Sequence, residues 1–579
     1  MRKEQSGSFV GVVVKRGRFH VVEPLFERSG RLPLERGKVR ADPGQMVLAA
    51  SSSRGVKAVR ALGSPKRARD IVQALLWEGL ERRGFPRRVE DEAREAPASA
   101  DDIDSTRRDL RDLATFTVDP ATARDFDDAV SAQPDGDGVR LWIHIADVSA
   151  HIRPGSALDS EAYRRATSVY VPGTVEPMIP GALSNEACSL VPDQDRLAVT
   201  AEVRIDASGK PRSASFYRSR IRSGARLDYD QLDRIFAGRE RAPELVAEPL
   251  ELARRAAAAL AAGRPRGALE VESFEPEFEF DSDGAVVGAH SVPQTEAHQL
   301  IEHLMILANE QVADLLEKRS SPVLYRVHEQ PDPARVDRLL DQLAAIDVPA
   351  PGSKKGMSPT EAGDLVGEIS RWVAREARRR GQGAQSLGSL VLRSLKQAYY
   401  TDKNLGHAGL GSPAYTHFTS PIRRYPDLIA HRSLLSVVGA GESAPDPSDV
   451  RDAGPWCSER EREAMQIERR ADRVCAAFLL ERELFERGHS THFEGEISGV
   501  INAGAFVRFR GELGDVYEGF VPARTLRGER FDLNETESAL VGGRTGREVR
   551  FGDPMTVTVT GVEAPRGRTD LEEVPVASS

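Results

Sequence analysis

The alternation of apolar and polar positions divides the chain into two strand-rich ends and a longer middle. Short apolar runs separated by Gly and Pro turns occupy residues 9–63 and again residues 494–562, which predicts a small β-barrel at each end. The middle combines strand-like runs such as 141–148 with an apolar stripe at helical spacing over 295–318. The pattern therefore predicts a mixed α+β domain between two barrels.

The boundaries of these units follow changes in composition. An acidic, Ala-rich stretch over 90–107 marks a connector after the first barrel, and a Gly/Pro-rich loop over 437–455 precedes a charged helix predicted at about 458–487. We expect a first barrel over 1–66, a helical linker over 67–110, a large domain over 111–438, a loop and connecting helix over 439–488, a second barrel over 489–566 and a tail over 567–579. A chain of 579 residues is indeed too long for one core.

The composition is that of a globular protein, with 40% hydrophobic and 29% charged residues. We find no run of 18 apolar residues and no apolar signal segment, so we expect no membrane span and a cytoplasmic location. Cys188, Cys457 and Cys475 lie far apart, which favours reduced thiols. The net charge of −9 does not indicate a nucleic-acid binder, yet it leaves room for a basic channel beside an acidic site.

A cluster of carboxylates marks the first chemically dense stretch, residues 119–128. Its members are Asp119, Asp125, Asp127 and Asp128. Like charges at this density favour a hard divalent cation such as Mg²⁺ or Mn²⁺. An EF-hand loop counted from Asp125 would need Gly and Glu where this chain has Val130 and Gly136, so that class of calcium site is excluded. A metal site and a solvated acidic turn remain the two interpretations.

The second dense stretch, residues 415–432, concentrates hydroxyl, imidazole and guanidinium groups. Its candidates for substrate binding and catalysis are His417, Ser420, Arg423 and Arg424. Such an excess of donors would satisfy a phosphate. Ser420 and Pro421 also have the form of an N-cap followed by proline in the first turn, so a buried polar network at a helix start is the alternative. The two interpretations are compatible.

The predicted barrels carry aromatic side chains that suit single-stranded nucleic acid. In the second barrel the candidates are Phe506, Phe509, Tyr517 and Phe520, interleaved with Arg508 and Arg510. Packing in the core is the alternative for Phe506 and Phe520. In the first barrel the same two interpretations apply to Phe9, Phe19, His20 and Phe26.

Five segments, in order along the chain, closely resemble the catalytic domain of the ribonuclease II and ribonuclease R family. They are residues 119–128, 167–172, 297–302, 324–329 and 417–427. Residues 540–547 also resemble ribonuclease R. The fold class that the resemblance implies is multidomain α+β, in which a central mixed α/β RNB catalytic domain lies between an N-terminal cold-shock/OB β-barrel and a C-terminal S1-type OB β-barrel.

The family resemblance implies a processive, Mg²⁺-dependent 3′→5′ exoribonuclease of the exoribonuclease II type, which hydrolyses single-stranded RNA to nucleoside 5′-monophosphates in RNA turnover. By similarity the four aspartates would hold one or two Mg²⁺ ions, with Mn²⁺ as the alternative. Asp127, Asp128 and Arg423 would carry the chemistry, and Arg423 would stabilise the pentacovalent transition state. The expected partner is the 3′ end of single-stranded RNA, bound by a monomer without an obligate protein partner.

Two further residues receive substrate-binding roles from the resemblance. Tyr170 would stack on the 3′-terminal base and set the length of the final product, and an ordinary strand aromatic is the alternative. Glu302 would contact the 3′-terminal ribose, where hydrogen bonds to hydroxyls distinguish RNA from DNA. Packing at the helix surface is the alternative for Glu302, and His298 could be its supporting neighbour.

Departures from the family pattern leave several points open. Ribonuclease R usually has two N-terminal cold-shock domains and often a lysine-rich tail, whereas we expect one barrel and no basic tail here. His303 stands where an acidic residue is common, and Val271 lies near a position that can carry a stacking Phe. A catalytically inactive RNB-domain protein that binds RNA or regulates would have lost an aspartate or Arg423, and this chain keeps all five. A phosphoesterase for small nucleotides would not need the barrels.

Overall fold

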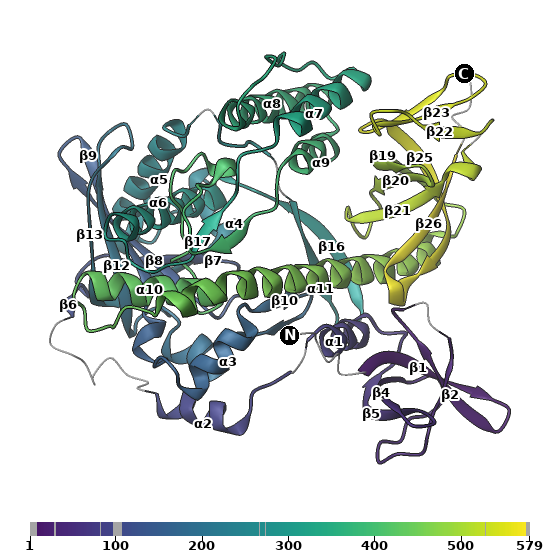
Figure 1. Cartoon of the computed structure of the whole chain (residues 1–579), viewed down its shortest axis with the longest axis horizontal. Helices are drawn as coiled ribbons and strands as arrows, with labels where there is room; N and C mark the ends of the chain where they lie inside the picture. The colour runs from purple at the N-terminus through teal and green to yellow at the C-terminus, as the bar shows by residue number, and fades with distance from the viewer. Residues whose placement is uncertain are drawn as a thin grey trace.

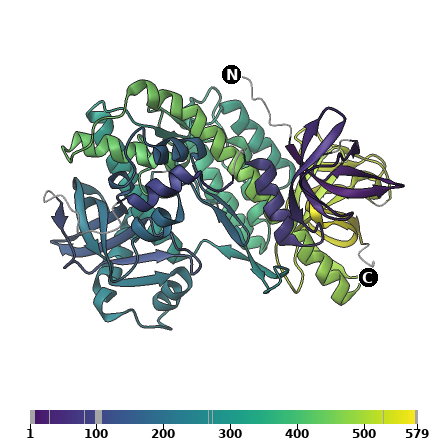
Figure 2. The same cartoon turned by 90° about the horizontal axis from the view of Figure 1, so that it is seen from below.

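The computed structural model describes residues 8–27, 30–80, 83–96, 107–265, 267–271, 274–526 and 528–574. Two small β units lie at one end of the molecule, and a large α+β unit forms the other end (Figure 1). The view turned by 90° agrees with this arrangement (Figure 2). The long helix α11 (Pro447–Arg487) runs from the large unit to the C-terminal β unit. The predicted order of the domains is therefore the observed one.

The N-terminal unit is a five-stranded sheet with strand order β3-β2-β1-β4-β5. Its strands are β1 (Ser8–Arg16), β2 (Phe19–Pro24), β3 (Leu32–Pro33), β4 (Met46–Ser52) and β5 (Gly55–Gly63). Alternate side chains from one face of the pleated sheet fill a small core around Val13, Val22 and Val47. A bridge between Leu34 and Val56 brings the two outer edges together, as the curling of a sheet into a barrel requires. Phe19 is exposed, so core packing does not explain this aromatic.

The linker is helical, as predicted, over α1 (Ala68–Gly79) and α2 (Arg87–Glu95). Ile71, Leu75 and Leu76 form the buried stripe of α1, which packs against α11. The connector predicted over 90–107 begins inside α2, and its residues 97–106 lie outside the described part of the chain. Residues 108–109 already pair with the central sheet, so the predicted linker ends too late.

A seven-stranded sheet with the order β14-β7-β8-β9-β12-β13-β6 forms the middle of the large unit. Its strands are β6 (Arg108–Asp109), β7 (Phe116–Asp119), β8 (Asp128–Asp135), β9 (Gly138–Ala146), β12 (Asp195–Ile205), β13 (Pro211–Arg222) and β14 (Ala225–Asp228). Helices α5 (Ala247–Ala262) and α6 (Glu296–Lys318) share one apolar core with the sheet. The stripe of α6 that the sequence predicts, including Leu300 and Leu304, lies in this core.

The remaining elements of the large unit surround this sheet. The helices are α3 (Ala157–Arg165), α4 (Tyr229–Phe236), α7 (Pro333–Ala345), α8 (Pro359–Arg380), α9 (Ala384–Ser394) and α10 (Tyr425–Val437). Three strand pairs are β10 (Val169–Val171) with β11 (Thr174–Glu176), β15 (Phe274–Phe280) with β16 (Val286–Pro293), and β17 (Tyr325–Val327) with β18 (Tyr399–Thr401). Short helical turns are η1 (Val148–Ala150), η2 (Ala182–Ala187), η3 (Glu244–Val246) and η4 (Ala408–Leu410).

Helix α11 begins eleven residues before its predicted start at about 458, because it starts at Pro447. Asp446 caps the helix by accepting a hydrogen bond from the Ser448 backbone at 2.7 Å, and Pro447 occupies the first turn. Pro455, which looks like a breaker in sequence, lies inside the helix. Packing of Ala453 and Cys457 into the core of the large unit offsets the cost of that proline. Within the described residues, no helix is both long enough and apolar enough to span a bilayer.

The C-terminal unit is a closed barrel with strand order β19-β20-β21-β26-β25. Its strands are β19 (His492–Ile501), β20 (Gly504–Phe509), β21 (Tyr517–Pro522), β25 (Pro554–Glu563) and β26 (Arg568–Glu573). A small sheet is formed by β22 (Phe531–Leu533), β23 (Ala539–Gly542) and β24 (Glu548–Arg550). Two short helical turns are η5 (Ala523–Thr525) and η6 (Ala564–Arg566). The predicted tail over 567–579 is wrong, because β26 closes the barrel. Only Thr569 and Leu571 of β26 face inward, which is too weak an alternation to reveal a strand. Residues 575–579 lie outside the described part.

Candidate active site

The aspartate cluster lies in the connection between two neighbouring strands of the central sheet. Asp119 ends β7 and Asp128 begins β8, and the two strands are antiparallel with Phe116 opposite Val130. The chain therefore leaves the sheet at Asp119 and returns beside it at Asp128, which gathers the carboxylates of the loop at one edge of the sheet. The sequence pattern placed the four residues together, and the strand pairing supplies the reason.

Burial makes these carboxylates costly to ionise. Burial raises the pKa of Asp127 to about 8, and the Arg423 charge offsets only part of that rise. The pKa of Asp119 also rises, first through burial and then through repulsion from Asp128, Asp127 and Asp125. Burial likewise raises the pKa of Asp128. The cluster thus holds more negative charge than its surroundings compensate.

The donor set of the cluster fits a hard divalent cation. Oδ2 of Asp119 is buried and accepts no hydrogen bond from any residue that the structure describes, and the buried Oδ2 of Asp127 has an ion pair with Arg423 but no hydrogen bond from the described residues. Buried carboxylate oxygens without donors are costly, and a cation would satisfy them. Across the described ranges, however, no three His, Cys, Asp or Glu side chains are arranged closely enough to form a finished metal site. An ion held here would have to draw the carboxylates inward.

Arg423 joins the second dense stretch to the aspartates. Its Nε lies 3.3 Å from Oδ2 of Asp127, and the backbone N–H of Ile422 donates to Oδ1 of the same carboxylate at 2.9 Å. The Nη2 group of Arg423 donates to Oγ of Ser420 at 3.0 Å. With 45% of its side chain exposed, Arg423 faces the open side of the cluster. Two stretches about 300 residues apart therefore form one site.

Three residues predicted to bind substrate support the loop that carries Arg423. Arg424 donates twice to Asp427, at 2.8 Å each, and Asp427 also accepts the backbone N–H of Ser420 at 2.8 Å. His417 shares a hydrogen bond with the hydroxyl of Tyr400 at 2.8 Å, and burial holds its pKa well below the usual value. The direct substrate roles expected for His417, Ser420 and Arg424 remain predictions. Their polar groups form the buried network that was the alternative.

Tyr170 lies at the mouth of the site, on the short strand β10. Its hydroxyl donates to Oδ2 of Asp125 at 2.9 Å, and its backbone N–H donates to Glu468 of α11 at 2.8 Å. The side chain is 38% exposed, so one side of the ring is open. The backbone carbonyl of Arg423 accepts the N–H of Ser168 at 3.0 Å. The hairpin with Tyr170 and the loop with Arg423 are thus joined directly.

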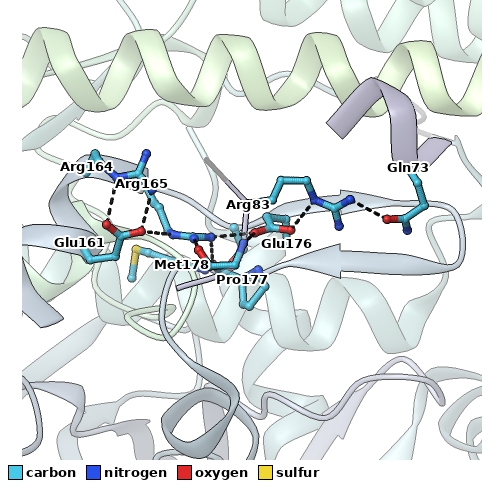
Figure 3. Close-up of polar contacts among 10 residues, drawn as sticks. Gln73, Arg83, Glu161, Arg164, Arg165, Glu176, Pro177 and Met178 are labelled. Carbon is cyan, nitrogen blue, oxygen red and sulfur yellow. Dashed lines mark hydrogen bonds and ion pairs between the residues drawn. The ribbon is translucent and has the colours of Figure 1, made fainter. Parts of the chain in front are cut away.

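A buried ion network holds this hairpin from behind (Figure 3). Glu176, which ends β11, binds Arg165 at 3.1 Å and Arg83 at 3.0 Å. Arg165 also binds Glu161 at 2.9 Å, and Arg83 donates to Gln73 of α1 at 2.6 Å. The network connects the linker to the hairpin of Tyr170. Sequence reasoning missed it because its partners lie up to about 90 residues apart and no local pattern relates them.

Glu302 lies on α6 in the wall of a cavity of about 1450 Å³, which Arg264 and Val271 also line. Burial raises the pKa of Glu302, while Arg264 and a hydrogen bond from Gln294 lower it by less. His298, one turn earlier, stacks on Tyr229 with ring centroids 4.0 Å apart. The structure therefore places Glu302 in a recess large enough for a ligand and leaves its role as a prediction.

The aromatic candidates of the C-terminal barrel separate into two groups. Phe506 is 37% exposed, and the centroid of its ring lies 5.1 Å from that of Phe520. This pair is therefore available at the surface. Phe509 and Tyr517 are buried, and the Tyr517 hydroxyl donates to Glu483 at 2.9 Å. Because side chains alternate along a strand, Phe506 and Phe509 of β20 must face opposite sides. The predicted binding roles of Phe509 and Tyr517 are therefore wrong.

Comparison with known proteins identifies the family of the chain. The family model described as the RNB domain matches residues 107–440. Ribonuclease R 1 of Lactococcus lactis is 32% identical over 99% of this chain and 69% of its own length. Ribonuclease R of Vibrio parahaemolyticus is 37% identical over 81% of this chain, which spans 56% of that protein. The matched part of the chain thus spans little more than half of the Vibrio protein and about two thirds of the Lactococcus protein.

Solved structures share the fold. Mycoplasma genitalium RNase R, in complex with ribose-methylated single-stranded RNA, superposes with a TM-score of 0.88 at 24% identity, over 99% of this chain and 90% of the other. Yeast Ssd1, described as a pseudonuclease, superposes with a TM-score of 0.68 at 17% identity over 93% of this chain and 68% of the other. The family resemblance found in the sequence is confirmed: this chain belongs to the ribonuclease R family of RNB-domain proteins.

Proposed function

We propose that this chain is a Mg²⁺-dependent, processive 3′→5′ exoribonuclease of the exoribonuclease II type, which hydrolyses single-stranded RNA to nucleoside 5′-monophosphates. One observation carries the proposal: four aspartates share one loop, burial raises the pKa values of three of them, and the Nε atom of Arg423 lies 3.3 Å from Oδ2 of Asp127. Ribonuclease R relatives at 32–37% identity support the same reaction.

The carboxylates of Asp119, Asp125, Asp127 and Asp128 would hold one or two Mg²⁺ ions, with Mn²⁺ as the alternative. Bound metal supplies a water of lowered pKa and neutralises charge on the scissile phosphate. The exposed guanidinium of Arg423 is placed to donate to a phosphoryl oxygen, where negative charge grows in the transition state. The ring of Tyr170 would stack on the 3′-terminal base, with its hydroxyl anchored on Asp125. Glu302 would accept a ribose hydroxyl from its cavity wall.

The two terminal β units would bind RNA upstream, as a cold-shock-like and an S1-like OB barrel. Phe506 and Phe520 offer the open aromatic pair that stacking on bases requires. We propose a cytoplasmic monomer that acts alone on RNA 3′ ends. Three buried free thiols agree with a reducing compartment.

An inactive RNA-binding protein is the second candidate. The fold alone does not separate the two, because the pseudonuclease Ssd1 shares it. The site argues for activity, since all four aspartates and Arg423 are present and in one place. A phosphoesterase for small nucleotides would leave both barrels without a purpose.

The first test is a time course on a 5′-labelled single-stranded RNA and on a hairpin with a 3′ overhang, with Mg²⁺ and with EDTA. We expect progressive shortening and mononucleotide release with Mg²⁺ only. Intact single-stranded RNA in the presence of Mg²⁺ would refute the proposal. A stop several nucleotides before the stem would restrict the substrate to single strands.

A further inference from the structure

The cavity beside Glu302 is larger than a small ligand needs. Its volume of about 1450 Å³ exceeds the roughly 300–1,000 Å³ of small-molecule pockets. The walls come from α6, from α8, from the segment around 264–271 and from Phe274 at the start of β15. A space of this size and extended lining suits several units of a polymer.

The cavity begins close to the candidate active site. Gln299 of α6 lines it, and the preceding residue, His298, stacks on Tyr229 with ring centroids 4.0 Å apart. Tyr229 directly follows Asp228, which lies opposite Asp119 where β14 pairs with β7. This stacked pair therefore links the surroundings of the aspartates to the cavity wall. A strand held at the aspartates can continue past it into the cavity.

An exposed aromatic side chain lies on the far wall of this cavity. Trp372 of α8 is 40% exposed, whereas its neighbours Val373 and Ala374 are buried against the rest of the domain. The guanidinium of Arg375 lies 4.8 Å from the centroid of the Trp372 ring. Indole is the largest aromatic surface among the side chains, and an exposed ring at a cavity wall offers a face for a base.

The charges of the cavity favour stacking over binding through phosphates. Basic side chains such as Arg264, Arg371 and Arg375 alternate with acidic ones such as Glu302 and Glu368. A uniformly basic groove would bind the phosphate backbone of the RNA along its length. This mixed lining instead gives little net attraction to phosphate. Carboxylates can accept ribose 2′-hydroxyls, and stacking accepts every base. The lining therefore suits single-stranded RNA read through its bases and riboses.

We propose that Trp372 stacks on a base of the RNA several nucleotides upstream of the scissile bond, and that the cavity is the path which brings that base to α8. The inference rests on the proposed function, because it assumes that RNA occupies the aspartate site. This contact would hold the strand whatever its base sequence. The residue that provides it belongs to α8 and not to the loops that carry the aspartates and Arg423. RNAs too short to reach α8 gain nothing from it.

The test uses Asp128→Asn protein, in which bound RNA should stay intact, and RNAs that carry 2-aminopurine at successive positions from the 3′ end. We expect fluorescence quenching at one internal position beyond the terminal base, lost in Asp128→Asn/Trp372→Ala and kept in Asp128→Asn/Trp372→Phe. The Kd of RNAs that include this position should rise about 5- to 100-fold in the alanine variant. Shorter RNAs should bind unchanged.

Phe485→Ala in the Asp128→Asn background is the matched control, because Phe485 is 86% exposed on α11 and does not line the cavity. Its Kd should change by less than about twofold. Equal quenching and equal Kd with and without the indole would overturn the stacking role. The proposed function fails separately: a wild-type protein that quenches through Trp372 but leaves RNA intact with Mg²⁺ would refute the exoribonuclease and keep the stacking site.

Discussion

Two groups of buried carboxylates in the large unit face the same desolvation cost and meet it in different ways. Asp147 has no exposed side-chain surface, yet it binds Arg107 at 2.8 Å and Arg218 at 3.0 Å and accepts the Ser149 hydroxyl at 2.6 Å. Burial alone would raise the pKa of Asp147, but Arg218 and Arg107 hold it well below its usual value. In the 119–128 loop, Asp119, Asp127 and Asp128 have no such surplus of guanidinium groups, and their pKa values rise.

The difference lies in compensation, since both groups are buried. A carboxylate matched by two arginines fixes the positions of the elements that carry them, here η1, β13 and the start of the domain. Carboxylates left with excess charge raise the free energy of the folded chain and gain most from an added cation. We therefore expect substitutions in the first group to change stability and substitutions in the second to change chemistry.

The largest effect should come from Asp128→Asn. The amide keeps the shape of the side chain but removes a charge that the metal site requires, so kcat for single-stranded RNA should fall about 10²- to 10⁴-fold. RNA affinity should stay within about twofold, because the channel is unchanged. Single-turnover hydrolysis and a binding titration measure the two quantities. Asp112→Asn, at an exposed position, is the matched control, and equal loss in both variants would contradict the assignment.

Arg423 and Arg424 are neighbours in the sequence, but their substitution should have different effects on catalysis and on stability. Arg423→Ala should lower kcat about 10²- to 10³-fold with little loss of stability, since its side chain is half exposed. Arg424→Ala leaves Asp427 buried and unmatched, so the free energy of unfolding should fall by about 3–5 kcal/mol. Urea denaturation and steady-state kinetics on both variants separate the roles. A stable Arg424→Ala protein with a purely catalytic defect would show that Arg424 contacts substrate after all.

Asp147→Asn tests the compensated group. It should lower the free energy of unfolding at pH 7 by about 3–5 kcal/mol, because the buried guanidinium groups of Arg107 and Arg218 lose the charge of Asp147. Arg218 keeps its ion pair with Glu442. The depressed pKa of Asp147 means that its stabilisation is present above the unfolded value of about 3.9 and is lost as the pH falls below it. The difference between wild type and variant should therefore shrink toward acid pH in denaturation curves. A difference that does not change between pH 7 and pH 3 would refute this account.

The smallest expected effect is the response of the metal-free protein to Mg²⁺. A raised carboxyl pKa destabilises the fold increasingly as the pH rises from the unfolded value of about 3.9 toward about 8. Added Mg²⁺ should raise the Tm by several degrees at pH 8 and by less at pH 5.5, where protons compete for the carboxylates. Differential scanning calorimetry of EDTA-treated protein measures both shifts. The shift should shrink in Asp128→Asn and persist in Asp112→Asn.

Local patterns predicted the parts of the fold and site that depend on neighbouring residues. The strands of both ends, the apolar stripe of α6 and the two dense polar stretches all appear within short windows of sequence. Contacts over long distances were not predicted: nothing in the sequence near Glu176 indicates that it pairs with Arg83. The Arg424–Asp427 pair is local, but the sequence does not show whether the guanidinium group binds this carboxylate or a phosphate. The sequence could have shown that Phe506 and Phe509 point to opposite faces of the strand, because they are three residues apart and side chains in a strand alternate with period two. The polar composition of β26 hid that strand, and Pro455 hid the first turns of α11.

Helix α11 is held near both of its ends by hydrogen bonds to other elements. The Ser458 hydroxyl accepts the backbone N–H of Tyr400 at one end, and Glu483 accepts backbone N–H groups of the C-terminal barrel at the other. At 1.5 Å per residue its 41 residues span roughly 60 Å. One residue inserted between the anchors would rotate the barrel by about 100° and swing the Phe506 face out of phase with the catalytic domain. An insertion of about seven residues, close to two whole turns, would restore that phase.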